Sequence, residues 1–85
     1  MADLPDRGLL KEALAAAGGV HNEYERVVLK GVVDDRWAGF YAAYVLGNVG
    51  DFTSVSRLAD LLEEVEAADD WAAHAAEHVL TKLRS

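Results

Sequence analysis

Apolar residues recur every three or four positions along most of the chain, and the strict apolar–polar alternation of a strand is sustained nowhere. The single proline, Pro5, lies ahead of the first periodic segment. The pattern therefore predicts an all-α protein, a single domain over residues 1–85 in which short loops join antiparallel helices. Five helices are predicted, at residues 6–17, 22–33, 35–49, 54–66 and 69–84.

Capping residues and glycines set the first of these boundaries. Asp6 is a suitable N-cap for the first helix, and the pair Gly18-Gly19 is predicted to stop it. Asn22 is then a suitable cap for the second helix. Gly31 weakens the last turn of that helix by about 1 kcal/mol relative to alanine.

The helix predicted at residues 35–49 has almost no polar side. Its apolar members are Trp37, Ala38, Phe40, Tyr41, Ala42, Ala43, Tyr44, Val45, Leu46 and Val49. A helix that is hydrophobic all round is normally contacted by neighbours on most of its faces. We therefore expect this helix to be central in the fold.

The segment at residues 35–49 reappears 34 positions later in the chain. The identical pairs are Asp35/Asp69, Trp37/Trp71, Ala38/Ala72, Ala42/Ala76, Val45/Val79 and Leu46/Leu80. They include both tryptophans of the sequence. A fixed period of this length is typical of stacked helical hairpins, none of which can bury its apolar face alone. The repeat therefore indicates a binding scaffold rather than an enzyme.

An alanine-rich helix, a glycine–aspartate turn and a valine-led helix follow one another, and a second alanine-rich helix then begins. The residues concerned are Ala42, Ala43, Val45, Leu46, Gly47, Gly50, Asp51, Val55, Leu58, Leu61, Leu62, Trp71, Ala72, Ala76, Val79 and Leu80. This order resembles the HEAT-like repeats of the phycobilisome-lyase type, best over residues 35–83. That family usually has an arginine near the start of each first helix, where this chain has Trp37 and Trp71. The resemblance implies a short HEAT-like α-solenoid or helical bundle that binds other proteins.

The net charge of −7 is unevenly distributed along the chain. Between Leu58 and Thr81 there is no lysine or arginine, but there are seven acidic residues: Asp60, Glu63, Glu64, Glu66, Asp69, Asp70 and Glu77. Repulsion from phosphates argues against nucleic acid as a direct ligand, whereas a basic protein surface would be attracted. A solvated helix face that keeps the domain soluble is the simpler interpretation of the same charges.

Cellular location is constrained only weakly by the composition. The chain has no cysteine, and no apolar stretch approaches the roughly 20 residues of a membrane span. The first residues are acidic and lack the apolar run of a secretory signal. We therefore expect a cytoplasmic protein that does not associate with membranes.

The strongest metal-binding pattern lies in the last predicted helix. His74 and His78 have the i, i+4 spacing that lets two imidazoles share a metal ion, and Glu77 lies on the same flank. No second helix offers a matching pair, so surface histidines are the preferred interpretation. Phosphate-binding loops and nucleophile motifs are also missing from the sequence. We therefore expect no catalytic site, no metal and no cofactor.

One side of the third predicted helix carries a strip of aromatic residues. Trp37, Tyr41, Tyr44 and Asn48 fall within about 60° of one another at 3.6 residues per turn. Aromatic side chains dominate the hot spots of protein interfaces, although packing against the first or second helix is the alternative. The predicted partner-binding residues are this strip and the acidic residues nearby, namely Trp37, Tyr41, Tyr44, Asn48, Glu63, Glu64 and Glu66.

Three functional interpretations remain open at this point. The first is a non-enzymatic interaction or scaffold module built of HEAT-like hairpins, whose partner is another protein with a basic surface. The second is a bacterial adaptor of the death-fold, CARD-like type, a six-helix bundle that assembles by homotypic contacts. The third is a small acidic inhibitor protein. Self-association is compatible with the first two.

Overall fold

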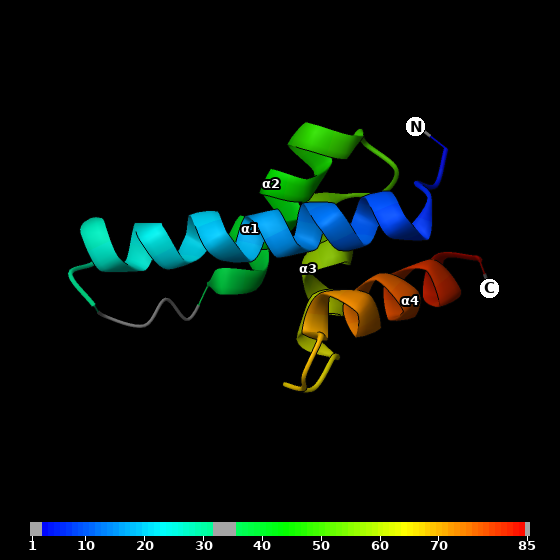
Figure 1. Cartoon of the computed structure of the whole chain (residues 1–85). Coiled ribbons are helices and arrows are strands. Elements are labelled where there is room, and N and C mark those ends of the chain that lie inside the picture. Colours follow the sequence, from blue (N-terminus) through cyan, green and yellow to red (C-terminus); the bar gives the residue numbers. More distant parts are fainter. Residues whose placement is uncertain (1–2, 32–35, 85) are drawn as a thin grey trace.

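The computed structural model describes residues 3–31 and 36–84, and these residues are all-helical, without strands (Figure 1). They form four helices: α1 (Arg7–Val27), α2 (Trp37–Val49), α3 (Val55–Glu63) and α4 (Trp71–Arg84). The predicted all-α class is confirmed. The predicted number of five helices is wrong, and the described residues also hold fewer helices than the six of the death-fold alternative.

The first two predicted helices are a single helix, because Gly18 and Gly19 lie within α1 and do not end it. Each internal glycine weakens a helix by about 1 kcal/mol relative to alanine. Burial of a single leucine side chain is worth about 1.5–3 kcal/mol, so a continuous buried stripe outweighs both glycines. That stripe crosses the glycine pair and consists of Leu10, Ala13, Leu14, Ala17 and His21.

The two ends of α1 have clear causes in the sequence. Asp6 is the N-cap, as predicted, and its carboxylate accepts hydrogen bonds from two backbone N–H groups at 3.0 and 3.3 Å. At the other end, Lys30 (φ 54°) and Gly31 (φ 88°) adopt left-handed conformations that turn the chain away. Asn22 lies inside α1 and therefore caps no helix. Residues 32–35, where the predicted second helix ends and the third begins, lie outside the described part of the chain.

The remaining helices lie close to their predicted positions. Ser54 caps α3, and its hydroxyl accepts a hydrogen bond from the Arg57 N–H at 3.1 Å. This helix ends at Glu63, three residues earlier than predicted. Helix α4 begins at Trp71, two residues later than predicted, because Asp70 has a left-handed conformation with φ 56° that a helix does not accept.

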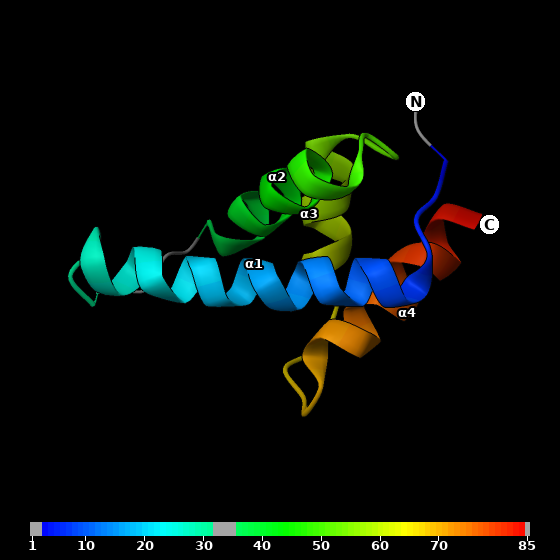
Figure 2. The same cartoon turned by 45° about the horizontal axis from the view of Figure 1, so that its top comes forward.

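The four helices surround one core. Helix α1 packs against α2 and α4, and α3 packs against the same two helices (Figure 1 and Figure 2). The buried apolar side chains are Leu10, Ala13, Leu14, Ala17, Ala38, Ala42, Val45, Leu46, Phe52, Leu58, Leu61, Leu62, Ala75, Ala76, Val79 and Leu80. Helix α2, expected to be central, packs along α1 and α3, touches α4 through the rings of Trp37 and Tyr41, and leaves Ala43 and Gly47 exposed.

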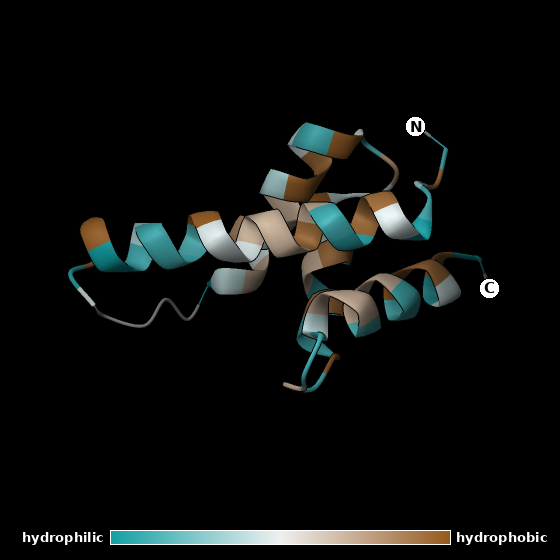
Figure 3. Ribbon diagram, viewed as in Figure 1, coloured by the Kyte–Doolittle hydropathy of each residue, from teal (hydrophilic) through white to brown (hydrophobic). Residues whose placement is uncertain are grey.

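The C-terminal end of α1 extends beyond the other helices in both views of the fold (Figure 1 and Figure 2). Apolar residues recur along this projecting end when the ribbon is coloured by hydropathy (Figure 3). Helices α2 and α4 therefore cover α1 along the rest of its length but not at this projecting end. None of the helices in the described residues is both long and apolar enough to cross a membrane.

Candidate interaction surface

Three aromatic rings from α2 and α4 meet at the edge of the core. The Tyr41 ring lies 5.2 Å from that of Trp37 and 5.7 Å from that of Trp71, between ring centroids. The planes of both pairs are nearly perpendicular, at 83° and 89°, which is the preferred edge-to-face geometry. The Trp71 indole N–H also points to the Val65 carbonyl oxygen at 3.4 Å, which ties the start of α4 to the preceding loop.

A second aromatic group joins α1 to α2 around the buried imidazole of His21. Its ring centroid lies 4.9 Å from that of Phe40, 5.4 Å from that of Tyr41 and 6.3 Å from that of Tyr24. Its Nδ1 atom faces the Glu25 carboxylate at 3.8 Å. Since Tyr41 belongs to both groups, an unbroken series of aromatic contacts connects α1, α2 and α4.

Tyr41 is the residue on which this series depends. A Cβ atom at Gly18 would lie 3.2 Å from the Tyr41 hydroxyl oxygen, so the missing side chain at Gly18 gives the ring its place on α1. Burial raises the pKa of the Tyr41 hydroxyl above its usual range, and the Glu25 carboxylate adds to the rise. The hydroxyl is therefore held in its neutral form.

The predicted aromatic strip divides between two environments. Trp37 and Tyr41 are half-buried against Trp71 and α1, which corresponds to the packing alternative. Tyr44 and Asn48 lie one and two turns further along α2, and the Asn48 side-chain amide donates to the Tyr44 carbonyl oxygen at 2.8 Å. The four residues share one face of α2, and two of them, Tyr44 and Asn48, line a hollow.

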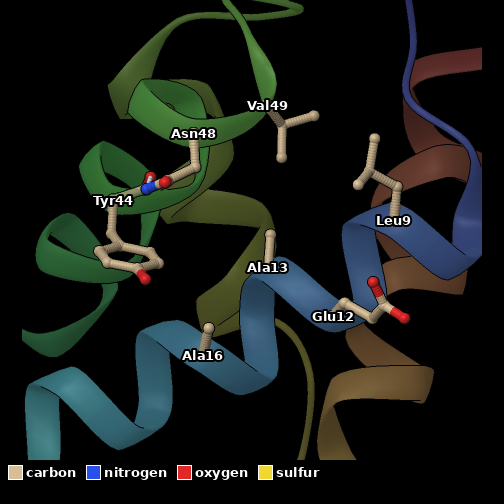
Figure 4. Close-up of a pocket in the computed structure, with 7 residues that line it drawn as sticks. All are labelled: Leu9, Glu12, Ala13, Ala16, Tyr44, Asn48 and Val49. Atoms are coloured by element: carbon tan, nitrogen blue, oxygen red, sulfur yellow. Dashed lines mark hydrogen bonds between the residues drawn. The ribbon is translucent and has the colours of Figure 1, made fainter.

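This hollow lies between the N-terminal half of α1 and the C-terminal end of α2 and has a volume of about 230 Å³ (Figure 4). Its lining consists of Leu9, Glu12, Ala13, Ala16, Tyr44, Asn48 and Val49. Figure 4 shows small alanine side chains on the α1 wall opposite Tyr44 and Asn48. Small side chains on this wall leave the hollow open and shallow.

A larger apolar surface lies at the projecting end of α1. Val20, Tyr24, Val27 and Val28 have the i, i+4, i+7 and i+8 spacing of one helix face, and they are 44%, 37%, 58% and 59% exposed. Phe40 of α2 adjoins them, and together these five residues line a second hollow of about 530 Å³ whose rim carries Glu23. We call these five residues the α1-end patch.

The α1-end patch was missed at the level of the sequence. Tyr24, Val27 and Val28 belong to the segment predicted as a separate second helix, at residues 22–33, that lies antiparallel to its neighbours. In the structure the segment is the continuation of α1, so its face extends past the neighbouring helices. The sequence does indicate one continuous helix here. The buried positions from Leu10 to His21 are spaced three or four residues apart, and this spacing continues unchanged across Gly18 and Gly19.

The predicted acidic residues lie in another part of the molecule. Glu63, Glu64 and Glu66 are exposed at the end of α3 and in the loop that follows. The same loop reaches α1 near its beginning, since the Asp70 carboxylate lies 3.6 Å from Lys11 Nζ. The structure therefore does not bring the acidic residues to the α1-end patch.

The candidate metal ligands of α4 point to different partners. His78 Nε2 lies 2.7 Å from the Glu64 carboxylate, which links α4 to the end of α3. Glu77 faces the Arg7 guanidinium at 3.6 Å, and His74 is exposed. In the described residues no group of three or more histidine, cysteine or acidic side chains is arranged to hold a metal ion.

The chain has also been compared with proteins of known family, function or structure. No family model, curated protein or solved structure matches it. What the protein does is therefore inferred from its own residues.

Proposed function

We propose that the chain is a non-enzymatic protein–protein interaction module, built of helical hairpins of the HEAT-like kind, that docks its partner on the α1-end patch. One observation carries this proposal. Among the described residues six large hydrophobic side chains are exposed. Four of them lie together: Val20, Tyr24 and Val27 on the last turns of α1, and Val28 at its C-cap. Single exposed apolar residues are normal on a protein surface, but a contiguous group marks an interaction site.

The chemistry of the patch favours a protein partner. Its five side chains are aliphatic or aromatic, and covering them removes apolar area from water at about 25 cal/mol per Å². Tyr24 and Phe40 contribute the aromatic area that typically dominates the energy of an interface. The shallow shape suits the apolar side of a helix better than a small ligand, which normally occupies an enclosed cleft.

The sequence-predicted residues keep a secondary part in this proposal. Tyr44 and Asn48 line the smaller hollow on the same pair of helices, so a partner lying along α1 would reach them from the patch. Glu63, Glu64 and Glu66 supply long-range attraction for a partner with a basic surface. Trp37 and Tyr41 support the arrangement of α1 and α2 from below the surface.

A matched pair of substitutions tests the patch. Val27→Asp places a charge in its centre, whereas Val55→Asp places the same charge at the start of α3, where Val55 is exposed to a similar extent. Affinity capture with each purified variant, followed by a binding titration of the captured partner, measures the effect. We expect Val27→Asp to weaken binding at least tenfold and Val55→Asp to leave it unchanged, with both variants equally helical by circular dichroism. If both variants bound the partner equally well, the α1-end patch would not be the docking surface.

A further inference from the structure

The smaller hollow, between the first half of α1 and the end of α2, combines apolar and polar side chains. Leucine, alanine and valine side chains form most of its lining, and Glu12, Tyr44 and Asn48 are its polar members (Figure 4). Its volume of about 230 Å³ is below the roughly 300–1,000 Å³ of a typical small-molecule site. The hollow therefore has room for one side chain rather than for a whole cofactor.

The polar atoms around this hollow are mainly hydrogen-bond acceptors. The ionised Glu12 carboxylate can only accept. The Asn48 side-chain nitrogen donates to the Tyr44 carbonyl oxygen at 2.8 Å, and its Oδ1 atom remains an acceptor. Of the described residues that line the hollow, none carries a positive charge. A group that binds here must therefore bring hydrogen-bond donors, and a positive charge favours it.

Glu12 supplies the negative charge of the hollow. Its side chain is exposed, and none of the residues that the structure describes forms an ion pair with it. The nearest basic side chains along α1, Arg7 and Lys11, face Glu77 and Asp70 instead. Adjacent residues of a helix point about 100° apart at 3.6 residues per turn, so Lys11 is directed away from the hollow. The Glu12 carboxylate is therefore available to a cation from another molecule.

Arginine suits this combination of groups better than lysine does. Its guanidinium is planar, presents five N–H donors and is more weakly hydrated than an ammonium group. It also stacks on aromatic rings, and Tyr44 provides one on the α2 wall. Its methylene stem covers apolar surface while the charged end stays in water, and Ala13 and Ala16 offer such surface on the α1 wall.

We propose that the smaller hollow receives an arginine side chain of the partner protein, with the methylene stem against Ala13 and Ala16 and the guanidinium on the Glu12 carboxylate. This inference rests on the proposed function, because it names one anchor of the partner that docks on the α1-end patch. Ala16 of the hollow and Val20 of the patch lie one turn apart on the same side of α1, so a single partner segment along α1 reaches both.

Titration of the isotope-labelled chain with blocked amino acids, followed by NMR, tests the hollow. The probe is N-acetyl-L-arginine amide, and its control is N-acetyl-L-citrulline amide, which has almost the same shape but no charge. We expect the arginine probe to shift the backbone amide signals of Ala13, Ala16 and Asn48, with a dissociation constant on the order of millimolar. An exposed ion pair changes a binding constant by up to about fivefold, so the citrulline control should bind correspondingly more weakly.

Three variants separate the charge of the hollow from its space. Glu12→Gln removes the carboxylate, and Glu63→Gln removes the same charge from the exposed end of α3. Ala16→Leu fills the alanine wall without changing a charge. We expect Glu12→Gln to weaken binding of the arginine probe about two- to fivefold and Glu63→Gln to leave it unchanged. Ala16→Leu should remove the shifts at the hollow, and all three variants should be equally helical by circular dichroism.

The arginine site and the proposed function fail by different results. Equal binding of the arginine and citrulline probes, equal effects of Glu12→Gln and Glu63→Gln, or shifts confined to the acidic residues at the end of α3 would overturn the arginine site. Equal capture of the partner by Val27→Asp and Val55→Asp would overturn the docking surface. If the arginine probe fails while those two variants still differ, the interaction function stands and only the arginine anchor is lost.

Discussion

The rings of Trp37 and Trp71 meet edge to face, with centroids 5.7 Å apart and planes at 75°, although 34 positions separate them in the chain. These residues occupy the same position in the two copies of the sequence repeat. Among the described elements, α2 and α4 are each packed against α1 and α3 rather than against each other. The two tryptophans, with Tyr41 between them, are therefore the direct link between the repeated segments.

The first prediction concerns the energy of this link. In a double-mutant cycle of Trp37→Leu and Trp71→Leu, we expect a coupling free energy of about 0.5–1.5 kcal/mol, the range found for aromatic pairs beyond their burial. Urea unfolding of the wild type, the two single variants and the double variant gives the four free energies. Additive effects would show that each ring acts only through the area that it buries.

The second prediction concerns the equivalent leucines of the repeat. Leu46 and Leu80 are 5% and 1% exposed in the common core. Replacing either with alanine leaves a cavity, and we expect a loss of roughly 2–5 kcal/mol in the free energy of unfolding. Thermal melts monitored by circular dichroism measure both variants beside Leu9→Ala, a leucine of α1 that is 49% exposed. A loss below half a kcal/mol at both buried sites would contradict their place in the core.

The third prediction tests the continuity of α1 at its two glycines. A Cβ atom at Gly19 meets nothing within 4 Å, so Gly19→Ala should stabilise the protein by up to about 1 kcal/mol. The same change at Gly18 brings a methyl group against the Tyr41 hydroxyl and should gain less or nothing. Chemical unfolding of the pair measures the difference. If the chain turned at these glycines instead, alanine would be strained and Gly19→Ala would destabilise.

These helix boundaries show what local patterns supply and what they omit. The caps at Asp6 and Ser54 and the core positions Leu46 and Leu80 follow from spacing and side-chain chemistry, which act over a few residues. A glycine pair is a stop signal only where no buried stripe continues beyond it. His21 is covered by Phe40 and Tyr41 of α2, so the outcome depends on a contact that no local pattern contains.

The candidate site shows the same limit more strongly. Helical spacing correctly places Trp37, Tyr41 and Tyr44 on one side of α2. It does not show that Trp71 arrives beside the first two and leaves Tyr44 to line a hollow, because that contact joins two distant helices. Val27 is exposed because α1 is one long helix that extends past its neighbours. The sequence pattern was interpreted as two shorter helices instead.

The last prediction concerns Tyr41 and pH. Burial, with a smaller contribution from the Glu25 carboxylate, raises the pKa of the Tyr41 hydroxyl in the folded chain. The pKa of tyrosine in the unfolded chain is about 10. The folded state therefore holds the phenolic proton more tightly than the unfolded state does, and its stability falls wherever the unfolded chain loses that proton first.

The sign of this effect fixes the pH window. The contribution of Tyr41 to stability is fully present below about pH 10 and is lost as the pH rises through the raised pKa of the folded state. Tyr41→Phe keeps the ring contacts with Trp37, Trp71 and His21 but has no proton to lose. Urea unfolding at pH 8, 10 and 11 should show a steeper loss of stability for the wild type than for Tyr41→Phe. Parallel pH profiles for the wild type and Tyr41→Phe would mean that the hydroxyl is as free to ionise in the folded chain as in water.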